Sequence, residues 1–226
     1  QTLYKHPLYN ALTDFEPVAL MTEQPMALIV RNELAVDTLQ QFTAYAKVNQ
    51  TKMQFGSGGP GSATHLACVL LNSAIGVNVT HVPYRSAAMA IQDVIGGRLD
   101  YLCPIVSTAI AQIEGHQVKP VALLSKTRSA VFPALATAQE QGLADFDAYM
   151  WNGLFVPKGT PQPIVKKLHD ATVGALDRAS VQEKIKEMGG AIVAPERRSP
   201  EYLRRFVETE IAKWAVPIRA TGLSMD

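Results

Sequence analysis

A glycine-rich segment, Phe55–Leu66 (FGSGGPGSATHL), restricts more than any other feature what this chain can fold into. The apolar run Met53–Phe55 leads into it and an apolar pattern of helical period follows, so the sequence predicts a strand, a tight turn and a helix. The first N–H groups of a helix have no partner within the helix and carry partial positive charge. Glycines let the backbone present such N–H groups to a ligand at close range. The segment is therefore a candidate anion site; the alternative is a plain turn in which Ser62 caps the helix.

The segment differs from the two common phosphate-binding motifs. No Gly-Lys-Ser/Thr sequence follows it, as a Walker A loop requires. Gly56, Gly58 and Gly61 satisfy the pattern G-x-G-x-x-G, but no acidic residue follows until Asp93, so the acid that binds ribose in a dinucleotide site is missing.

A carboxylate fits this loop at least as well as a phosphate, because backbone N–H groups and hydroxyl groups form strong hydrogen bonds to it. Tyr84 and Arg85 are further candidates, since they follow the strand expected at Val77–Val82 and ligands often bind where strands of an α/β sheet end. Packing of the Tyr84 ring and a solvated Arg85 are the alternatives. The candidate ligand-binding residues are Ser57, Gly59, Gly61, Ser62, Ala63, Thr64, Tyr84 and Arg85.

Composition and motifs argue against several functions. The 226 residues carry a net charge of +1, which disfavours nucleic acid or a membrane surface as the main partner. No apolar run is long enough for a transmembrane helix. We expect no metal and no cofactor: His65 lacks a ligand partner at helical spacing, so packing or capping is its expected role. An enzyme is not expected either, because no Gly-x-Ser-x-Gly elbow is followed by an acid and a histidine.

The two cysteines leave two interpretations open. Cys68 lies on an expected buried helix and Cys103 in an expected buried strand. They are either two buried thiols or one disulfide, and a disulfide would require an oxidising compartment. Gln1 is not an initiator methionine, which is compatible with a removed leader.

Strand and helix patterns alternate with short connections along the first two thirds of the chain. This alternation predicts a mostly parallel sheet with helices on both faces. Ser107 or Thr108 is expected to open one helix, Ser180 another, and Pro217 to end or kink the last one. The expected strands are Glu16–Met21, Ala27–Val30, Met53–Phe55, Val77–Val82, Leu99–Ile105 and Val118–Leu124, and a short helix is expected at Leu135–Gln141.

Three segments follow from this alternation. We expect residues 23–147 to form a complete α/β lobe, and residues 148–226 to be mostly helical and to return to the other lobe together with residues 1–22. The helices of residues 148–226 have apolar stripes that must pack against a sheet, and the chain offers few strands for it. We therefore expect the lobe that contains these helices to be incomplete and to associate with a second chain.

Taken together, these motifs resemble one family, the solute receptors of tripartite tricarboxylate transporters, also called the Bug family. The motifs run in the family's order over essentially the whole chain, and they are specific as a set. They are Asp14–Ala19 (DFEPVA), Gly56–Leu66, His81–Arg85 (HVPYR), Asp93–Asp100 (DVIGGRLD), Val156–Pro161 (VPKGTP) and the final helix with Trp214.

The resemblance implies a type II periplasmic binding-protein fold, in which two α/β lobes close around a cleft, with lobe one incomplete in this chain. It also implies a periplasmic receptor that hands a small carboxylate to a membrane permease. The chain departs from the family pattern in two places. Cys103-Pro104 stands where an Asp is common, and Arg85-Ser86 stands where Lys-Gly is common; the arginine keeps the charge and offers a planar fork. The alternative function is a cytoplasmic effector-binding domain of a transcription regulator.

Overall fold

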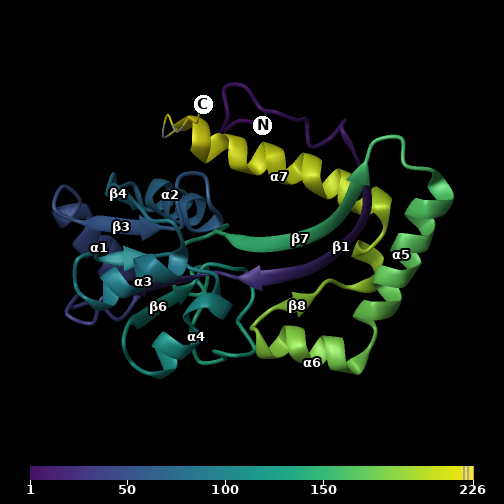
Figure 1. The fold of residues 1–226 in the computed structure, drawn as a ribbon. Helices are drawn as coiled ribbons and strands as arrows, with labels where there is room; N and C mark the ends of the chain where they lie inside the picture. Colours follow the sequence, from purple (N-terminus) through teal and green to yellow (C-terminus); the bar gives the residue numbers. More distant parts are fainter. Residues whose placement is uncertain (221, 223, 226) are drawn as a thin grey trace. The chain divides into compact units, whose positions relative to one another are not determined.

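Each of the two units of the chain is built around its own β-sheet (Figure 1). In this computed structural model, unit 1 combines Gln1–Glu23 with Trp151–Asp226, and unit 2 spans Gln24–Met150. The structure describes residues 1–220, 222, 224 and 225.

Five strands form the sheet of unit 2 in the order β4-β3-β5-β2-β6. β3 pairs in parallel with β4 and with β5, whereas β2 pairs antiparallel with β5 and β6. All four residues of β2 are buried, as expected for a central strand that is covered on both faces. The strands are β2 (Ala27–Val30), β3 (Gln54–Ser57), β4 (Thr80–Pro83), β5 (Tyr101–Leu102) and β6 (Lys119–Leu123).

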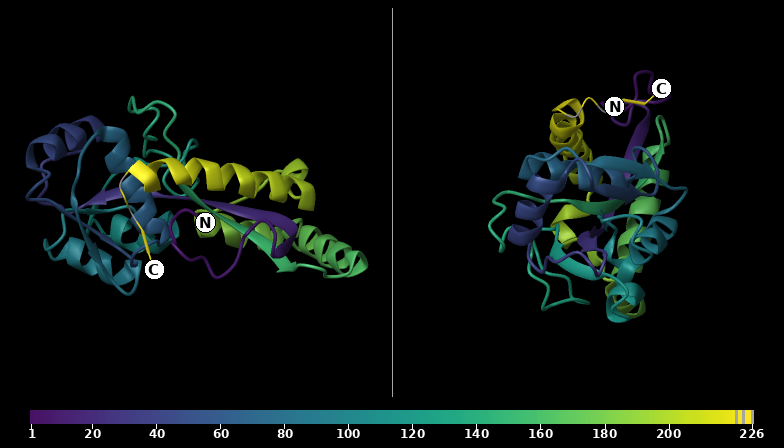
Figure 2. Two further views of the ribbon diagram at one scale, coloured as in Figure 1. Left: turned by 90° about the horizontal axis from the view of Figure 1, so that it is seen from above. Right: turned by 90° about the vertical axis from the view of Figure 1, so that its left-hand side faces the viewer.

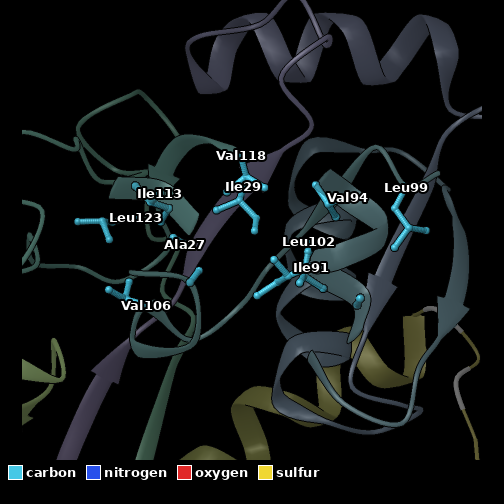
Figure 3. Packing of buried hydrophobic residues seen from close by; sticks show 12 residues of the cluster. Ala27, Ile29, Ile91, Val94, Leu99, Leu102, Val106, Ile113, Val118 and Leu123 are labelled. Atoms are coloured by element: carbon cyan, nitrogen blue, oxygen red, sulfur yellow. The ribbon is translucent and has the colours of Figure 1, made fainter. Parts of the chain in front are cut away.

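Helices cover both faces of this sheet. Successive side chains of a strand point to opposite faces, so Leu102 of β5 meets α3 and α4, while Tyr101 packs edge-on against Phe42 of α1. The cluster under α3 and α4 is wholly apolar (Figure 3). The helices are α1 (Leu39–Asn49), α2 (Ala63–Ile75), α3 (Ala87–Ile95) and α4 (Val106–Glu114).

Unit 1 packs its longest helix along a three-stranded sheet of order β7-β1-β8 (Figures 1 and 2). Leu20 of β1 and Leu203 of α7 are fully buried at this contact. Arg197 connects the end of β1 to the start of α7, because it forms an ion pair with Glu23 of β1 and lies over the ring of Tyr202 of α7. The elements are β1 (Phe15–Pro25), β7 (Tyr149–Pro157), α5 (Gln162–Leu176), α6 (Ala179–Glu187), β8 (Ala191–Ile192), the 3₁₀ turn η1 (Pro195–Arg197) and α7 (Pro200–Ala220).

The expected alternation of strands and helices is present in unit 2, but the expected mostly parallel sheet is wrong. Two of the strand pairings are parallel and two are antiparallel. The reason is the position of β2, which lies between β5 and β6 and runs against both of them. The connections through α2, α3 and α4 join strands of the same direction, whereas α1 joins β2 to β3, which run in opposite directions.

Three local expectations are wrong, and Pro217 does not end the last helix. Leu135–Gln141 forms turns instead of a helix, because Leu123 of β6 bonds to the backbone of Ala136 and Ala138 and so draws the segment alongside the strand. The cap expected at Ser107 or Thr108 is Ile105, and the cap expected at Ser180 is Arg178. The last helix continues through Pro217 to Ala220.

No helix in the described part of the chain is long and apolar enough to cross a membrane.

Gly56 of β3 provides a test of the packing under α3. A methyl group at this position would lie 2.6 Å from Leu99 Cδ1 and 3.0 Å from Ala90 Cβ, and both neighbours are buried. We expect Gly56→Ala to lower the free energy of unfolding by about 1–3 kcal/mol, measured by urea denaturation. The control is Gly174→Ala in α5, where nothing lies within 4 Å and the change should be neutral or stabilising. Equal free energies of unfolding for the two variants would contradict the close packing of Gly56 against Leu99 and Ala90.

Candidate functional site

Three strand-to-helix junctions of unit 2 lie at the same edge of its sheet. β4, β3 and β5 are parallel neighbours, so their carboxyl ends share one edge, and α3, α2 and α4 respectively begin just after them. The N–H groups at the start of each helix have no partner within that helix and carry partial positive charge. This edge is therefore the part of unit 2 best suited to an anion.

The junction between β3 and α2 is a tight loop, residues 58–62, here called the glycine loop. Gly59 and Gly61 have φ values of 111° and 72°, which side-chain-bearing residues rarely adopt. A Cβ atom on Gly58 would lie 3.1 Å from the backbone nitrogen of Ala87, the first residue of α3. The loop thus packs against the start of α3, and glycine is needed both for its turns and for this approach.

Most N–H groups of the glycine loop have acceptors within the chain. The N–H of Gly58 donates to Thr64 Oγ1 (2.8 Å), that of Gly59 to Ser57 Oγ (3.0 Å) and that of Gly61 to His65 Nδ1 (3.0 Å). The N–H of Ser62 donates to the carbonyl of Gly59 (3.2 Å). These bonds hold the loop in one conformation before any ligand arrives.

Two N–H groups at the start of α2 are different. In the part of the chain that the structure describes, the N–H groups of Ala63 and Thr64 donate to no protein acceptor. Ser62 is the N-cap, as expected, and its Oγ accepts from the N–H of His65 (3.3 Å) and donates to the carbonyl of Gly59 (2.7 Å). Among the loop residues expected to bind ligand, Ala63 and Thr64 are thus the ones with uncommitted N–H donors.

Two stacked histidines contact the glycine loop and the end of β3. The rings of His65 and His81 stack with centroids 3.8 Å apart, and Phe55 stacks on His81 at 5.0 Å. His81 Nε2 lies 2.6 Å from Ser57 Oγ. Burial, together with the charge of His81, lowers the pKa of His65 to about 4, and burial also lowers the pKa of His81, so both rings are neutral at pH 7. The expected packing role of His65 is confirmed. His81 was not expected at the site; its parallel register with Phe55 is the signal that brings it there.

The Tyr84 hydroxyl has a partner of its own. It donates to Asp93 Oδ2 (2.5 Å), and Arg98 bonds the other oxygen of Asp93. Burial and the hydrogen bond to Asp93 raise the pKa of Tyr84 to about 12. In this arrangement the single hydroxyl proton of Tyr84 is already used. Arg85 is exposed, and within the described residues it takes part in no ion pair.

A disulfide joins two of the three junctions. Cys68 in α2 is bonded to Cys103, which lies just before α4, and the two Cα atoms are 5.5 Å apart. Both cysteines are fully buried. The structure thereby decides between the two interpretations of the cysteines in favour of the disulfide.

No group of three or more metal-ligating side chains occurs among the residues with described positions. The uncommitted donors at this edge are the backbone N–H groups at the start of α2, a type of group that suits an anion.

Known proteins resemble this chain over almost its whole length. The model of the tripartite tricarboxylate transporter family receptor matches residues 2–223. The chain belongs to this family. It is 35% identical to the UPF0065 protein in the TAR-I ttuE-ttuC' intergenic region of Agrobacterium vitis over 220 residues, which make up 97% of this chain and 64% of that relative. The chain thus spans slightly less than two thirds of the length of that relative.

Solved structures confirm the expected type II periplasmic binding-protein fold. MatC (Rpa3494) from Rhodopseudomonas palustris, solved with bound malate, has a TM-score of 0.87 and 34% identity, and the match covers 96% of this chain and 74% of MatC. The periplasmic binding protein BugD has a TM-score of 0.87 and 32% identity, with 100% of this chain and 75% of BugD covered. The resemblance to the Bug family is therefore confirmed as well.

The disulfide gives a direct test of how the site is held. Replacing both cysteines by alanine should lower the free energy of unfolding by about 3–4 kcal/mol, since the bond closes a loop with a sequence separation of 35. Urea denaturation of the wild type, with and without a reductant, measures this. The reduced wild type should match the double variant. If the urea midpoint did not change after complete reduction, verified by mass spectrometry, the stabilising role of the disulfide would be contradicted.

Proposed function

We propose that unit 2 binds the carboxylate group of a small organic acid at the start of α2. The observation that carries this proposal is the pair of uncommitted N–H groups of Ala63 and Thr64 beside a loop whose other donors are internally bonded. Two adjacent N–H groups match the two oxygens of one carboxylate, and the helix dipole favours its negative charge.

The other candidate residues take supporting roles in this proposal. Gly59 and Gly61 give the loop its turns, and the Ser57 and Ser62 hydroxyls hold its backbone. Arg85 is an exposed cation that follows β4 at the same edge of the sheet, so it attracts anions over a longer range. Tyr84 contacts the ligand through its ring or hydroxyl oxygen, because its proton is donated to Asp93.

The ligand class is a small mono- or dicarboxylate. The malate bound to MatC, a relative with 34% identity, supports this class. We further propose that the receptor works in the periplasm and hands its ligand to the membrane permease of a tripartite tricarboxylate-type transporter. The family and the Cys68–Cys103 disulfide support this, because disulfides persist in oxidising compartments. The same disulfide weighs against a cytoplasmic regulator domain.

Binding is tested by calorimetric titration with a panel of mono- and dicarboxylates of about two to six carbons. Ala63→Pro removes one proposed donor and leaves the helix intact, because Ala63 is the first helical residue and Ser62 is extended, as a residue before proline prefers. We expect this variant to bind at least about tenfold more weakly, the usual scale of a lost charge-assisted hydrogen bond.

The matched control is Ala179→Pro, the same change at the first residue of α6 in unit 1, which should leave affinity unchanged. If the wild type bound no member of the panel, the proposed function would be wrong. If both proline variants lowered the affinity equally, the start of α2 would not be part of the binding site.

We also propose that unit 1 associates with a second copy of the chain. Leu8 and Tyr9 are exposed large apolar residues, with 100% and 59% of their surface accessible. A recess of about 270 Å³ beside them is lined by Tyr9, Ala11, Phe15, Trp151, Phe155 and Val207. Exposed apolar surface of this kind usually marks a contact site.

Light scattering coupled to size-exclusion chromatography tests the association. The wild type should be a dimer at high concentration, and Tyr9→Lys should shift it to a monomer, because the substitution places a charge on the apolar surface. Val48→Lys, which changes an exposed apolar residue of unit 2, is the control and should leave the dimer intact. A monomeric wild type would refute the association.

A further inference from the structure

Among the described residues, no carboxylate is bonded to either ring of the His65–His81 stack. Of the described titratable groups, His81 is the one whose charge acts on His65, and for His81 the cause of its pKa shift is burial alone. Tyr101 lies next in the stack beyond Phe55, donates its hydroxyl to Asn72 and stays neutral because burial raises its pKa.

The carboxylates of Asp93 and Asp100 pair with residues other than the two histidines. Asp93 of α3 is held by Arg98 and Tyr84, and Asp100 before β5 is paired with Arg31. Two imidazolium rings with centroids 3.8 Å apart would repel each other strongly, because His65 is buried and His81 is partly buried. The pair is thus built to be neutral.

The neutral form of His65 has a defined task. Its Nδ1 accepts the N–H of Gly61 at 3.0 Å, so Nδ1 carries no proton and the proton of the neutral ring is on Nε2. Gly61 directly precedes the cap residue Ser62, and two residues later the free N–H groups of α2 begin. A proton on Nδ1 would point at the N–H of Gly61 and displace it.

His81 acts on the other end of the loop. Its Nε2 contacts Ser57 Oγ at 2.6 Å, and the same oxygen accepts the N–H of Gly59 at 3.0 Å. The two rings therefore fix Gly59 and Gly61, the two loop residues with positive φ, from one stacked pair. The pair supports the loop without adding a formal charge to the site.

We propose that His65 and His81 are positioning residues of the carboxylate site: as neutral rings they hold Gly61 and Gly59 in the conformation that aims the N–H groups of Ala63 and Thr64 at the ligand. This inference rests on the proposed function for its effect on affinity. Its structural half, the hold on the loop by the Nδ1 acceptor, concerns the ligand-free chain and is measurable without any ligand.

The test compares two substitutions of nearly equal size at position 65. His65→Asn keeps an acceptor where Nδ1 was, whereas His65→Leu removes it. We expect amide hydrogen exchange of Gly61 in the ligand-free chain to be at least about tenfold faster in His65→Leu than in His65→Asn. The amides of Ile91 in α3 and Leu102 in β5, both in the buried cluster, serve as the reference for global unfolding, and their exchange should be alike in the two variants.

Calorimetry with the best carboxylate of the panel then measures the effect on binding. His65→Asn should stay within about threefold of the wild type, and His65→Leu should bind at least about tenfold more weakly. In acid, the wild type should lose about twofold in affinity relative to His65→Asn at pH 4, where half of His65 is protonated. Protonation of the ligand itself is common to both proteins and cancels in the ratio.

The outcomes separate this inference from the proposed function. Different Gly61 exchange in the two variants, with no binding by any protein, would leave the positioning role standing and sink the proposed function. Equal Gly61 exchange and equal affinity of the two variants would overturn the positioning role. Tighter binding of the wild type relative to His65→Asn in acid would also overturn it, because the imidazolium would then attract the ligand.

Discussion

The parallel pairing of β3 with both β4 and β5 is the constraint on which the site depends. Parallel neighbours end at the same edge, so three helix starts meet there without any contribution from long loops. The alignment leaves the glycine loop little room, and Gly58 packs close to the first residue of α3. The Cys68–Cys103 bond then ties α2 to the segment before α4, which fixes two of the three helix starts covalently. Backbone direction, packing and a covalent bond thus act on the same few residues.

A glycine-rich turn can present its N–H groups to a ligand or use them to hold its own conformation, and the glycine loop uses them for the second purpose. Gly58, Gly59 and Gly61 donate to side chains of the same unit. Each internal bond removes a donor from the site, but it also removes a degree of freedom that the ligand would otherwise have to freeze. The division leaves the first residues of α2 as donors, and it explains why the hydroxyls near them point back to the loop.

The sequence was sufficient for most of the local elements and insufficient for the partners of individual atoms. The cap at Ser62 and the alternation around the glycine loop follow from short-range rules and are present in the structure. The direction of β2 could not be predicted, because it depends on which strands flank it and not on its own residues. The acceptors of the loop N–H groups could not be predicted for a similar reason. Ser57 Oγ accepts from the N–H of Gly59 and contacts His81, and that contact depends on the register of two strands that a whole helix separates in the sequence.

The neutrality of the histidine pair also bears on selectivity. A cation placed under the loop would bind any anion more strongly, including chloride and phosphate, and would do so through charge alone. In the proposed site, neutral rings would leave the short-range recognition of the carboxylate to the two N–H groups of α2. Arg85, which is exposed and lies outside the stack, would supply a long-range attraction that falls with salt. Affinity for the carboxylate head would then be separate from recognition of the rest of the ligand, so discrimination among carboxylates would have to come from residues outside the glycine loop.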